Sequence, residues 1–346
     1  KPTPLKMGGL PGNFRRNPDI CCRRTMKVCI FGAGAIGGCM GGRMALAGLD
    51  VSLVARGPHL VSMKKDGLRL EGSGGGQTVQ VTATDNPAEL GPQDFVIISV
   101  KAISLSGANI GPLLGPDTAV ITAMNGIPWW YNYGLESQRS ARPLESVDPG
   151  GDFWRRIGPE RAIGGIIGYS AKMPQPGVVR CVFGNRFDIG EPTGEMSERC
   201  LWLAELLNQS GFETRVSGTI RNEVWNKLLS TAVFNPLSAL TRANLGTLAN
   251  DADMRRLAKI MMREVSDVGT AAGSEFVGSI ESRIDRIATL GSHKSSMLQD
   301  IEAGRPLELD AILGSICEMG RLVGVRTPSL DMILAVLKIR ARHDYR

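Results

Sequence analysis

The sequence predicts an α/β protein with a doubly wound parallel sheet in its N-terminal part and only helices in its C-terminal part. Three observations carry this prediction. Short apolar runs recur in the first half of the chain, a glycine-rich string follows the first of them, and strand-like runs disappear after about Ser217. With 346 residues the chain has room for about two domains, which we place at 26–217 and 218–346.

The first strand is expected at 27–31, and a helix of small residues follows it as far as Ala47. The next apolar runs end in polar residues, as parallel strands do when both faces are buried and functional groups lie at their carboxyl ends. These runs are 50–56, 94–102 and 118–126. The glycine-rich segment 72–77 is expected to be a plain connector.

Further strands are expected at 163–173, 177–183 and 186–192, where Pro/Gly turns separate the apolar runs, and a helix is expected to begin at Ser197. Beyond Ser217 the apolar residues take the spacing of amphipathic helices. The expected helices are 220–239, 253–273, 277–290, 295–303, 307–322 and 330–340.

The positive charge of the chain is concentrated at its start. Residues 1–25 carry a net charge of +5 out of a total of +6, so the remaining residues are nearly neutral. A neutral body lacks the basic surface that binds nucleic acid or anionic lipid. The sequence also has no run of about eighteen apolar residues, the length that predicts a membrane span. We therefore expect neither nucleic acid nor a membrane as a partner.

The N-terminal segment and the cysteines bear on where the protein is found. Residues 1–25 lack the apolar core of a secretory signal, and a disordered tail ahead of Met26 is preferred to an Arg-rich transit peptide. The seven cysteines are odd in number and form no CxxC pair, so they predict no metal site and favour a reducing cytosol. We expect a cytoplasmic protein.

A glycine pattern marks the expected ligand site of the sheet. The residues that match G-x-G-x-x-G are Gly32, Ala33, Gly34, Ala35, Ile36 and Gly37. Because the pattern follows a strand and opens a helix, Gly32 suits a tight turn, Gly34 the approach of a pyrophosphate and Gly37 close helix packing. The helix N-terminus attracts the phosphate charge. We interpret these six residues as dinucleotide contacts of a Rossmann-type domain, although a glycine turn without a ligand gives the same pattern.

The end of the second strand indicates which dinucleotide is bound. A domain that binds NAD usually has Asp or Glu here to bond the ribose hydroxyls, whereas this chain has Arg56, which suits a 2′-phosphate. We therefore expect NADPH as the cofactor. His59 and Lys64 lie just beyond Arg56, and both are expected to be solvent-facing.

Histidine, the common proton donor beside a transferred hydride, is scarce in this chain. The three histidines are His59, His293 and His343. Of these, His293 alone is plausibly placed, which makes another acid attractive. On the expected helix 220–239, Lys227, Thr231 and Asn235 recur at every fourth residue and share one face. A lysine there is either a snorkelling rim residue or a partly desolvated proton donor, and the spacing leaves both open.

A second cluster of polar residues lies at 292–311. Ser295, Ser296 and Gln299 begin a helix, and Glu308 begins the next. Hydroxyl groups and free N–H groups at a helix start can hold a carboxylate. Simple capping explains either serine equally well, but it does not explain the density of polar groups.

On these motifs the sequence strongly resembles the ketopantoate reductase (2-dehydropantoate 2-reductase) family, over about residues 26–340. The shared motifs are GAGAIGG, VAR, SVKA, the NG at 125–126, IRNEVWNKL with NPLSAL, and SSMLQDIEAGRPLELD. The last two are far more specific than the glycine pattern. The resemblance implies an enzyme that reduces the 2-oxo group of ketopantoate with NADPH on the route to pantothenate.

The resemblance also implies roles for individual residues. It places the catalytic lysine at Lys227 and the acidic residue near cofactor and substrate at Glu308. The implied cofactor and substrate contacts are Lys101, Asn125, Asn235 and Ser296, with Thr231 on the same helix face as Lys227. Two departures concern the substrate. Thr231 stands where the family commonly has Asn, and the segment 127–153 is longer and more aromatic than in compact members.

Trp129 and Trp130 in that segment are expected either to line an enlarged pocket or to pack in the core. Two other functions remain open besides ketopantoate reduction. One is reduction of another 2-oxo acid, and the other is a nucleotide sensor without turnover, against which the retained Lys227 and Glu308 argue. A homodimer and a monomer are both compatible with the sequence.

Overall fold

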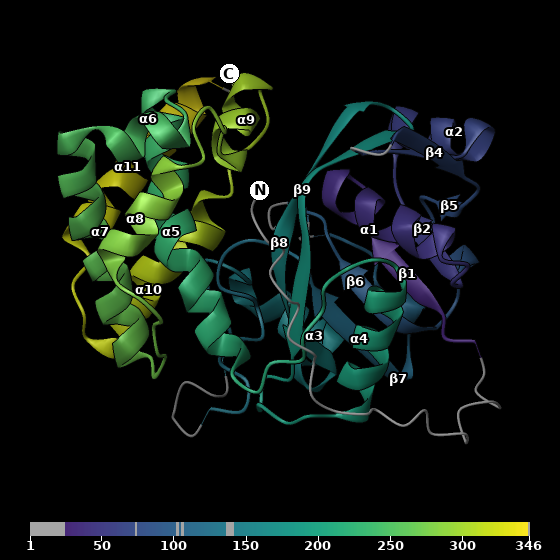
Figure 1. Cartoon of the computed structure of the whole chain (residues 1–346). Helices are drawn as coiled ribbons and strands as arrows, with labels where there is room; N and C mark the ends of the chain where they lie inside the picture. Colours follow the sequence, from purple (N-terminus) through teal and green to yellow (C-terminus); the bar gives the residue numbers. More distant parts are fainter. Residues whose placement is uncertain (1–24, 73–74, 102–103, 105–106, 136–141, 345–346) are drawn as a thin grey trace, which may run out of the picture.

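The computed structural model of the chain describes residues 25–72, 75–101, 104, 107–135 and 142–344. Within them a nine-stranded sheet fills the N-terminal part, and helices fill the C-terminal part beside it (Figure 1). The predicted fold class is therefore confirmed. The expected disordered tail, apart from its last residue, lies outside the described residues.

The sheet combines a parallel centre with an antiparallel edge. Its order is β4-β3-β9-β8-β7-β6-β1-β2-β5. The strands from β8 to β5 in this order run parallel, whereas β8 pairs with β9 in an antiparallel manner. The strands are β1 (Val28–Phe31), β2 (Val51–Val54), β3 (Leu68–Gly72), β4 (Gly75–Val79), β5 (Thr82–Thr84), β6 (Gln93–Ile98), β7 (Leu114–Thr122), β8 (Ala162–Gln175) and β9 (Val178–Gly190).

The segment 72–77 is not the plain connector that the sequence predicted. Gly72 ends β3, and Gly75 begins β4, which pairs with β3 in antiparallel register. Four of these six residues are glycine, so the segment has no apolar alternation from which a strand can be predicted. The backbone hydrogen bonds to β3 define the strand instead.

Helices flank the sheet and then make up the rest of the described chain. Those of the N-terminal part are α1 (Ala35–Leu46), α2 (Gly57–Asp66), α3 (Asp152–Ile157) and α4 (Glu198–Gln209). Those of the C-terminal part are α5 (Ile220–Thr241), α6 (Leu245–Asn250), α7 (Ala252–Ala271), α8 (Ile280–Ala288), α9 (Ser296–Glu302), α10 (Ser315–Val323) and α11 (Pro328–Asp344). A π-helical turn, Asp310–Gly314, leads into α10. The division into domains at residue 217 stays a prediction.

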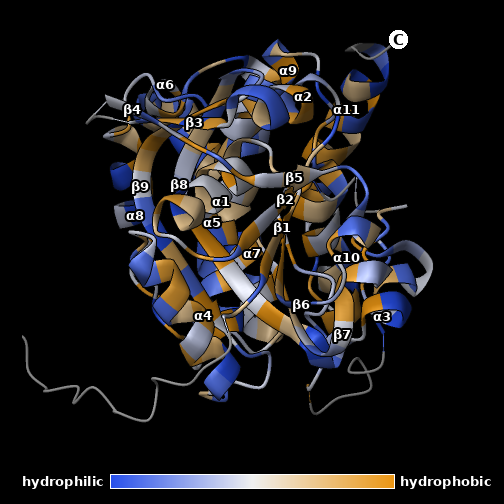
Figure 2. Ribbon diagram, turned by 90° about the vertical axis from the view of Figure 1, so that its right-hand side faces the viewer, coloured by the Kyte–Doolittle hydropathy of each residue, from blue (hydrophilic) through white to orange (hydrophobic). Residues whose placement is uncertain are grey.

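The two faces of the sheet belong to different hydrophobic cores. Successive side chains of a strand point to opposite faces. Val28 and Ile30 of β1 pack in a core that includes α1 and α4, whereas Cys29 and Phe31 join a core that continues into the helical part. The central strands are hydrophobic along their length (Figure 2). Because the second core includes both Trp130 and the buried side of α5, it docks α5 against the sheet.

A disulfide joins Cys39 of α1 to Cys181 of β9, with their Cα atoms 6.2 Å apart. This bond was not predicted, because in the expected reducing cytosol cysteines remain thiols. Cys29, Cys200 and Cys317 are buried free thiols. In the part of the chain that the structure describes, no helix is both long and apolar enough to cross a membrane.

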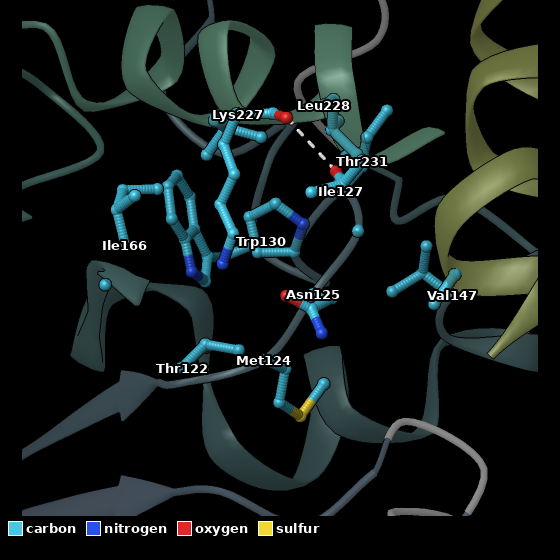
Figure 3. Close-up of a pocket in the computed structure, with 15 residues that line it drawn as sticks. Thr122, Met124, Asn125, Ile127, Trp130, Val147, Ile166, Lys227, Leu228 and Thr231 are labelled. Carbon is cyan, nitrogen blue, oxygen red and sulfur yellow. Dashed lines mark hydrogen bonds between the residues drawn. The ribbon is translucent and has the colours of Figure 1, made fainter. Parts of the chain in front are cut away.

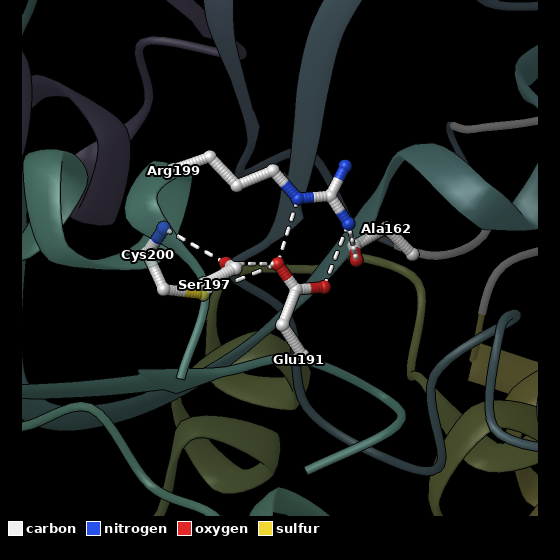
Figure 4. Close-up of polar contacts among 5 residues, drawn as sticks. All are labelled: Ala162, Glu191, Ser197, Arg199 and Cys200. Atoms are coloured by element: carbon white, nitrogen blue, oxygen red, sulfur yellow. Dashed lines mark hydrogen bonds and ion pairs between the residues drawn. The ribbon is translucent and has the colours of Figure 1, made fainter. Parts of the chain in front are cut away.

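An ion pair with a buried carboxylate ties the end of the sheet to α4 (Figure 4). The carboxylate of Glu191, which follows β9, accepts hydrogen bonds from Arg199 at 2.6 and 2.7 Å and from the Ser197 hydroxyl at 2.5 Å. Arg199 also donates to the carbonyl oxygen of Ala162, the first residue of β8. Ser197 caps α4, which begins one residue after the start that the sequence predicted. Burial raises the pKa of Glu191, but the bonds from Arg199 and Ser197 outweigh it and hold the pKa below its usual range.

We expect Arg199→Met to lower the free energy of unfolding by on the order of 3 kcal/mol near neutral pH, because it leaves a buried carboxylate unpaired. Urea unfolding measures the change. A carboxyl group with a lowered pKa stabilises the fold above its unfolded pKa and loses this effect as the pH falls through its folded pKa. The difference between the two proteins should therefore shrink in acid, and Glu191→Gln added to Arg199→Met should recover part of the loss. Equal stability near neutral pH would contradict this role.

Candidate active site

A large cleft lies where the parallel strands end. Its volume is about 1130 Å³, and it is lined by Phe31 and Val54 at the ends of β1 and β2 and by Ser99 and Ala123 just after β6 and β7. Residues of α9 line its other side. The strand order reverses between β1 and its neighbours β2 and β6, and in doubly wound sheets such a reversal is where ligands bind.

The glycine pattern forms one wall of this cleft. Five of its six residues, from Gly32 to Ile36, line the cleft. Gly32 has a φ of 106°, and a Cβ there would lie 2.8 Å from the backbone nitrogen of Val100. A Cβ on Gly34 would meet nothing within 4 Å, so this position opens toward the ligand space. The first turn of α1 has no acidic residue and no side-chain cap, which leaves its N–H groups for an anion.

Gly37, the last residue of the pattern, packs against the end of β6 and does not line the cleft. An added Cβ would collide with the Ser99 hydroxyl and the Gly32 carbonyl oxygen. Ser99 donates a hydrogen bond of 2.8 Å to that same carbonyl oxygen, which holds the turn against the end of β6. Gly37 therefore serves the close packing of α1, as its place in the pattern predicted.

His59 is not the solvent-facing residue that the sequence predicted. It is buried, its Nδ1 accepts a hydrogen bond from the Gly177 N–H at 2.9 Å, and its Nε2 lies 2.7 Å from the Ala33 carbonyl oxygen. Since a backbone N–H can only donate, Nε2 carries the proton and donates to Ala33. Burial lowers the pKa of His59, although the bond to Ala33 opposes this, and the neutral ring anchors the glycine turn. Arg56 is exposed at the rim of the cleft, and Lys64 is exposed as expected.

Lys101 lies just after β6, and its side chain reaches across the cleft to the helical part. Its ammonium group forms an ion pair of 2.6 Å with Asp300 of α9 and donates to the carbonyl oxygen of Pro306 at 3.2 Å. Asp300 also pairs with Arg305. All three charged residues line the cleft. Sequence reasoning did not single out Asp300, because a contact between residues about two hundred positions apart leaves no local pattern.

A smaller pocket, here called the inner pocket, continues from the cleft toward α5. Asn125 and Met124, which follow β7, line both cavities and so connect them. Lys227 and Thr231 of α5 line the inner pocket, and Figure 3 shows the Lys227 side chain extending from the helix into it. The Thr231 hydroxyl donates to the Lys227 carbonyl oxygen at 3.1 Å. Lys227 is therefore directed inward and is not a rim residue that snorkels to solvent.

The two polar clusters of the helical part also meet. The side-chain amide of Asn235 donates to the Ser296 hydroxyl at 3.4 Å. Ser296 lines the cleft, whereas Asn235 is buried behind it and lines neither the cleft nor the inner pocket. Glu308 lines the cleft. Among the described residues, no group of three or more His, Cys, Asp or Glu lies so that it could hold a metal ion.

The environment of Lys227 changes its acidity. Burial lowers its pKa from the usual 10.5 to about 8, and the negative charge of Glu308 opposes part of this shift. A lysine in this range keeps a proton at neutral pH and gives it up far more readily than a lysine in water. The inner end of the cleft can therefore protonate a reacting oxygen.

The two tryptophans after Asn125 have different surroundings. Trp129 and Trp130 are both fully buried in the core that joins sheet and helices. Trp130 also lines the inner pocket, and Trp129 does not. Both tryptophans therefore pack in the core, and Trp130 is also a pocket residue.

Comparisons with known proteins agree with this architecture. The family models for ketopantoate reductase PanE/ApbA match residues 28–194 and, for its C-terminal region, residues 219–341. A 2-dehydropantoate 2-reductase from Mesorhizobium japonicum is 44% identical over 90% of this chain and 97% of its own length. The crystal structure of a putative ketopantoate reductase from Ralstonia solanacearum has a TM-score of 0.88 and 36% sequence identity, and the match covers 93% of this chain and 99% of that chain.

A dimeric ketopantoate reductase from Staphylococcus aureus covers 92% of this chain and 100% of its own, with a TM-score of 0.70. At 22% identity it shows the fold alone. The two family models together span the glycine turn, the inner pocket and the polar cluster of α9. The chain therefore belongs to the ketopantoate reductase family.

Proposed function

We propose that this protein reduces 2-dehydropantoate to pantoate with NADPH, a step of pantothenate biosynthesis, and that Lys227 is the proton donor. The observation that carries the proposal is the amine of Lys227 at the inner end of the cleft, where burial brings its pKa to about 8. The name of the 44% identical relative supports the same reaction.

The residues of the cleft fit a dinucleotide. The open space beside Gly34 and the uncapped start of α1 suit a pyrophosphate, and the exposed Arg56 at the end of β2 suits a 2′-phosphate. Lys101 and Asn125, which follow β6 and β7, are proposed as further cofactor contacts. When bound, the nicotinamide ring supplies the hydride that reduces the 2-oxo carbon.

The chain's own residues then have distinct tasks. The ammonium group of Lys227 stabilises the negative charge that develops on the carbonyl oxygen and protonates it. Glu308 favours the charged form of Lys227, because its negative charge raises the lysine pKa. Asn125, Thr231, Asn235 and Ser296 are proposed to bind the substrate, with Asn235 acting through the Ser296 hydroxyl. Because the donor must be charged, activity is present below a pH of about 8 and falls above it.

We also propose a cytoplasmic location. The free thiols of Cys29, Cys200 and Cys317 support it, because a reducing compartment preserves them. The bond between Cys39 and Cys181 does not support it.

The reaction is tested by mixing the purified protein with NADPH and 2-dehydropantoate and following NADPH absorbance. We expect oxidation with this substrate, and we expect Lys227→Ala to lower kcat by a factor of roughly 10² or more while NADPH still binds. Lys259→Ala, on α7 and outside both cavities, is the matched control. If NADPH is oxidised only with other 2-oxo acids, one of those acids is the substrate. If no acid of a broad panel is reduced, the protein is a sensor. Full activity of Lys227→Ala would show that the lysine is not the proton donor.

Arg56 generates a separate prediction about cofactor choice. Arg56→Asp should weaken NADPH binding and remove the preference over NADH, since a carboxylate repels the 2′-phosphate and can bond the ribose hydroxyls. Equilibrium titration with both cofactors measures the preference. Lys64→Asp, on α2 just beyond Arg56 but outside the cleft, should leave the preference unchanged. Equal affinity of the unmodified protein for NADH and NADPH would contradict the assignment.

We further propose that the chain forms a homodimer through α11. Met332, Val336 and Ile339 lie on one face of this helix, and these residues are 66%, 46% and 58% exposed. Exposed apolar residues on one helix face support an interaction site, and two copies can cover them across a two-fold axis. Light scattering should give the dimer mass for the unmodified protein and a lower mass for Met332→Glu with Ile339→Glu. A monomer mass for the unmodified protein across concentrations would exclude this interface.

A further inference from the structure

Two residues that line the inner pocket carry buried polar atoms that the proposed reaction does not use. The Thr122 hydroxyl and the indole N–H of Trp130 both belong to lining residues that are at most 3% exposed. Neither atom has a hydrogen-bond partner in the described part of the chain. Buried polar groups are normally paired, and an unpaired one costs about 1–3 kcal/mol. Two such atoms at one cavity indicate that something in the cavity pairs with them.

The size of the inner pocket limits what that partner can be. Its volume is about 20 Å³. A single water needs roughly 10–15 Å³ measured in this way. The cavity therefore has room for one oxygen atom with its hydrogens.

The chemistry of the lining atoms selects the kind of oxygen. The indole N–H of Trp130 and the ammonium group of Lys227 can only donate, whereas the Thr122 hydroxyl can donate or accept. A cation would be repelled by the two donors. A hydroxyl oxygen satisfies all three groups, because it accepts from Trp130 and Lys227 and donates its own hydrogen to Thr122. Figure 3 shows the amine of Lys227 and the indole of Trp130 on the same side of the pocket.

We propose that Thr122, Trp130 and Lys227 form a subsite for one hydroxyl oxygen, which comes from a water molecule or from a hydroxyl group of the substrate. This oxygen positions the amine of Lys227 for proton transfer. The subsite rests on the proposed function in taking Lys227 as the proton donor, but its binding chemistry does not require turnover. Trp130 and Thr122 thereby become positioning residues for the reaction.

The subsite has a consequence for the acidity of Lys227. An oxygen that accepts a hydrogen bond from an ammonium group favours its charged form. Lys227 is the one titratable side chain among the described residues that line the inner pocket, and Glu308 is the charged group that raises its pKa. Emptying the subsite therefore removes one of two effects that oppose desolvation, and the pKa of Lys227 should fall further.

The first test is an NMR titration of ¹⁵N-labelled lysine side chains in the full chain, without cofactor or substrate. We expect Trp130→Phe and Thr122→Val each to lower the Lys227 midpoint by roughly 0.5 pH units or more, because water is lost from the pocket. Thr122→Ser should restore it. Trp129→Phe is the matched control, since Trp129 also has a buried, unpaired indole N–H but lies outside the pocket. Equal midpoints for Trp129→Phe, Trp130→Phe and Thr122→Val would overturn a water-filled subsite.

The second test separates the two sources of the oxygen by comparing 2-dehydropantoate with its analogue that lacks the hydroxyl group. If the substrate supplies the oxygen, Thr122→Val lowers kcat/KM about tenfold for 2-dehydropantoate and leaves the analogue unaffected. If water supplies it, both substrates lose the same factor. Unchanged kcat/KM for both, together with unchanged lysine midpoints, would overturn the subsite. A protein that titrates as expected but turns over neither substrate would contradict the proposed function and leave the subsite supported.

Discussion

The burial of one amine is the constraint on which the rest of the site depends. Moving a lysine side chain out of water disfavours its charge, and the lowered pKa of Lys227 records that cost. The fold tolerates this cost because α5 cannot rotate to expose Lys227 to solvent. Val224 and Leu228, on either side of Lys227, are fixed in the core shared with Trp130 and the sheet, so packing determines where the amine points.

The position of the Lys227 amine relative to the cleft also depends on contacts between the sheet and the helical part. Gly126 has a φ of 98° and approaches the backbone of Ala311 so closely that a Cβ would lie 2.6 Å from its carbonyl carbon. The Ile127 N–H donates to the same carbonyl group at 3.2 Å. Together with the ion pair between Lys101 and Asp300, these contacts hold strand ends and helices at one edge. The cleft and the inner pocket meet there, so an amine from one part can serve a ligand held by the other.

Local patterns predicted the elements whose signal is local. The glycine turn was readable because φ at Gly32 and open space at Gly34 follow from residue type and position in a strand–helix unit. The helix face of Lys227 followed from its spacing, and the motifs shared with a family indicated its role. The anchoring by neutral His59, the partner of Lys101 and the difference between Trp129 and Trp130 depend on contacts between distant segments, for which spacing gives no signal. The glycine-rich strand β4 was missed because Val79 is its one apolar side chain, which is too few to alternate.

The most direct test of the central claim is a crystal structure of the protein with NADP⁺ and the 2-oxo acid, in which the distance from the Lys227 amine to the substrate's carbonyl oxygen is measured. Our account predicts a separation of about 2.7–3.2 Å, with the amine still inside the inner pocket. An amine turned to bulk solvent, or a different acid in hydrogen-bond contact with that oxygen, would contradict it.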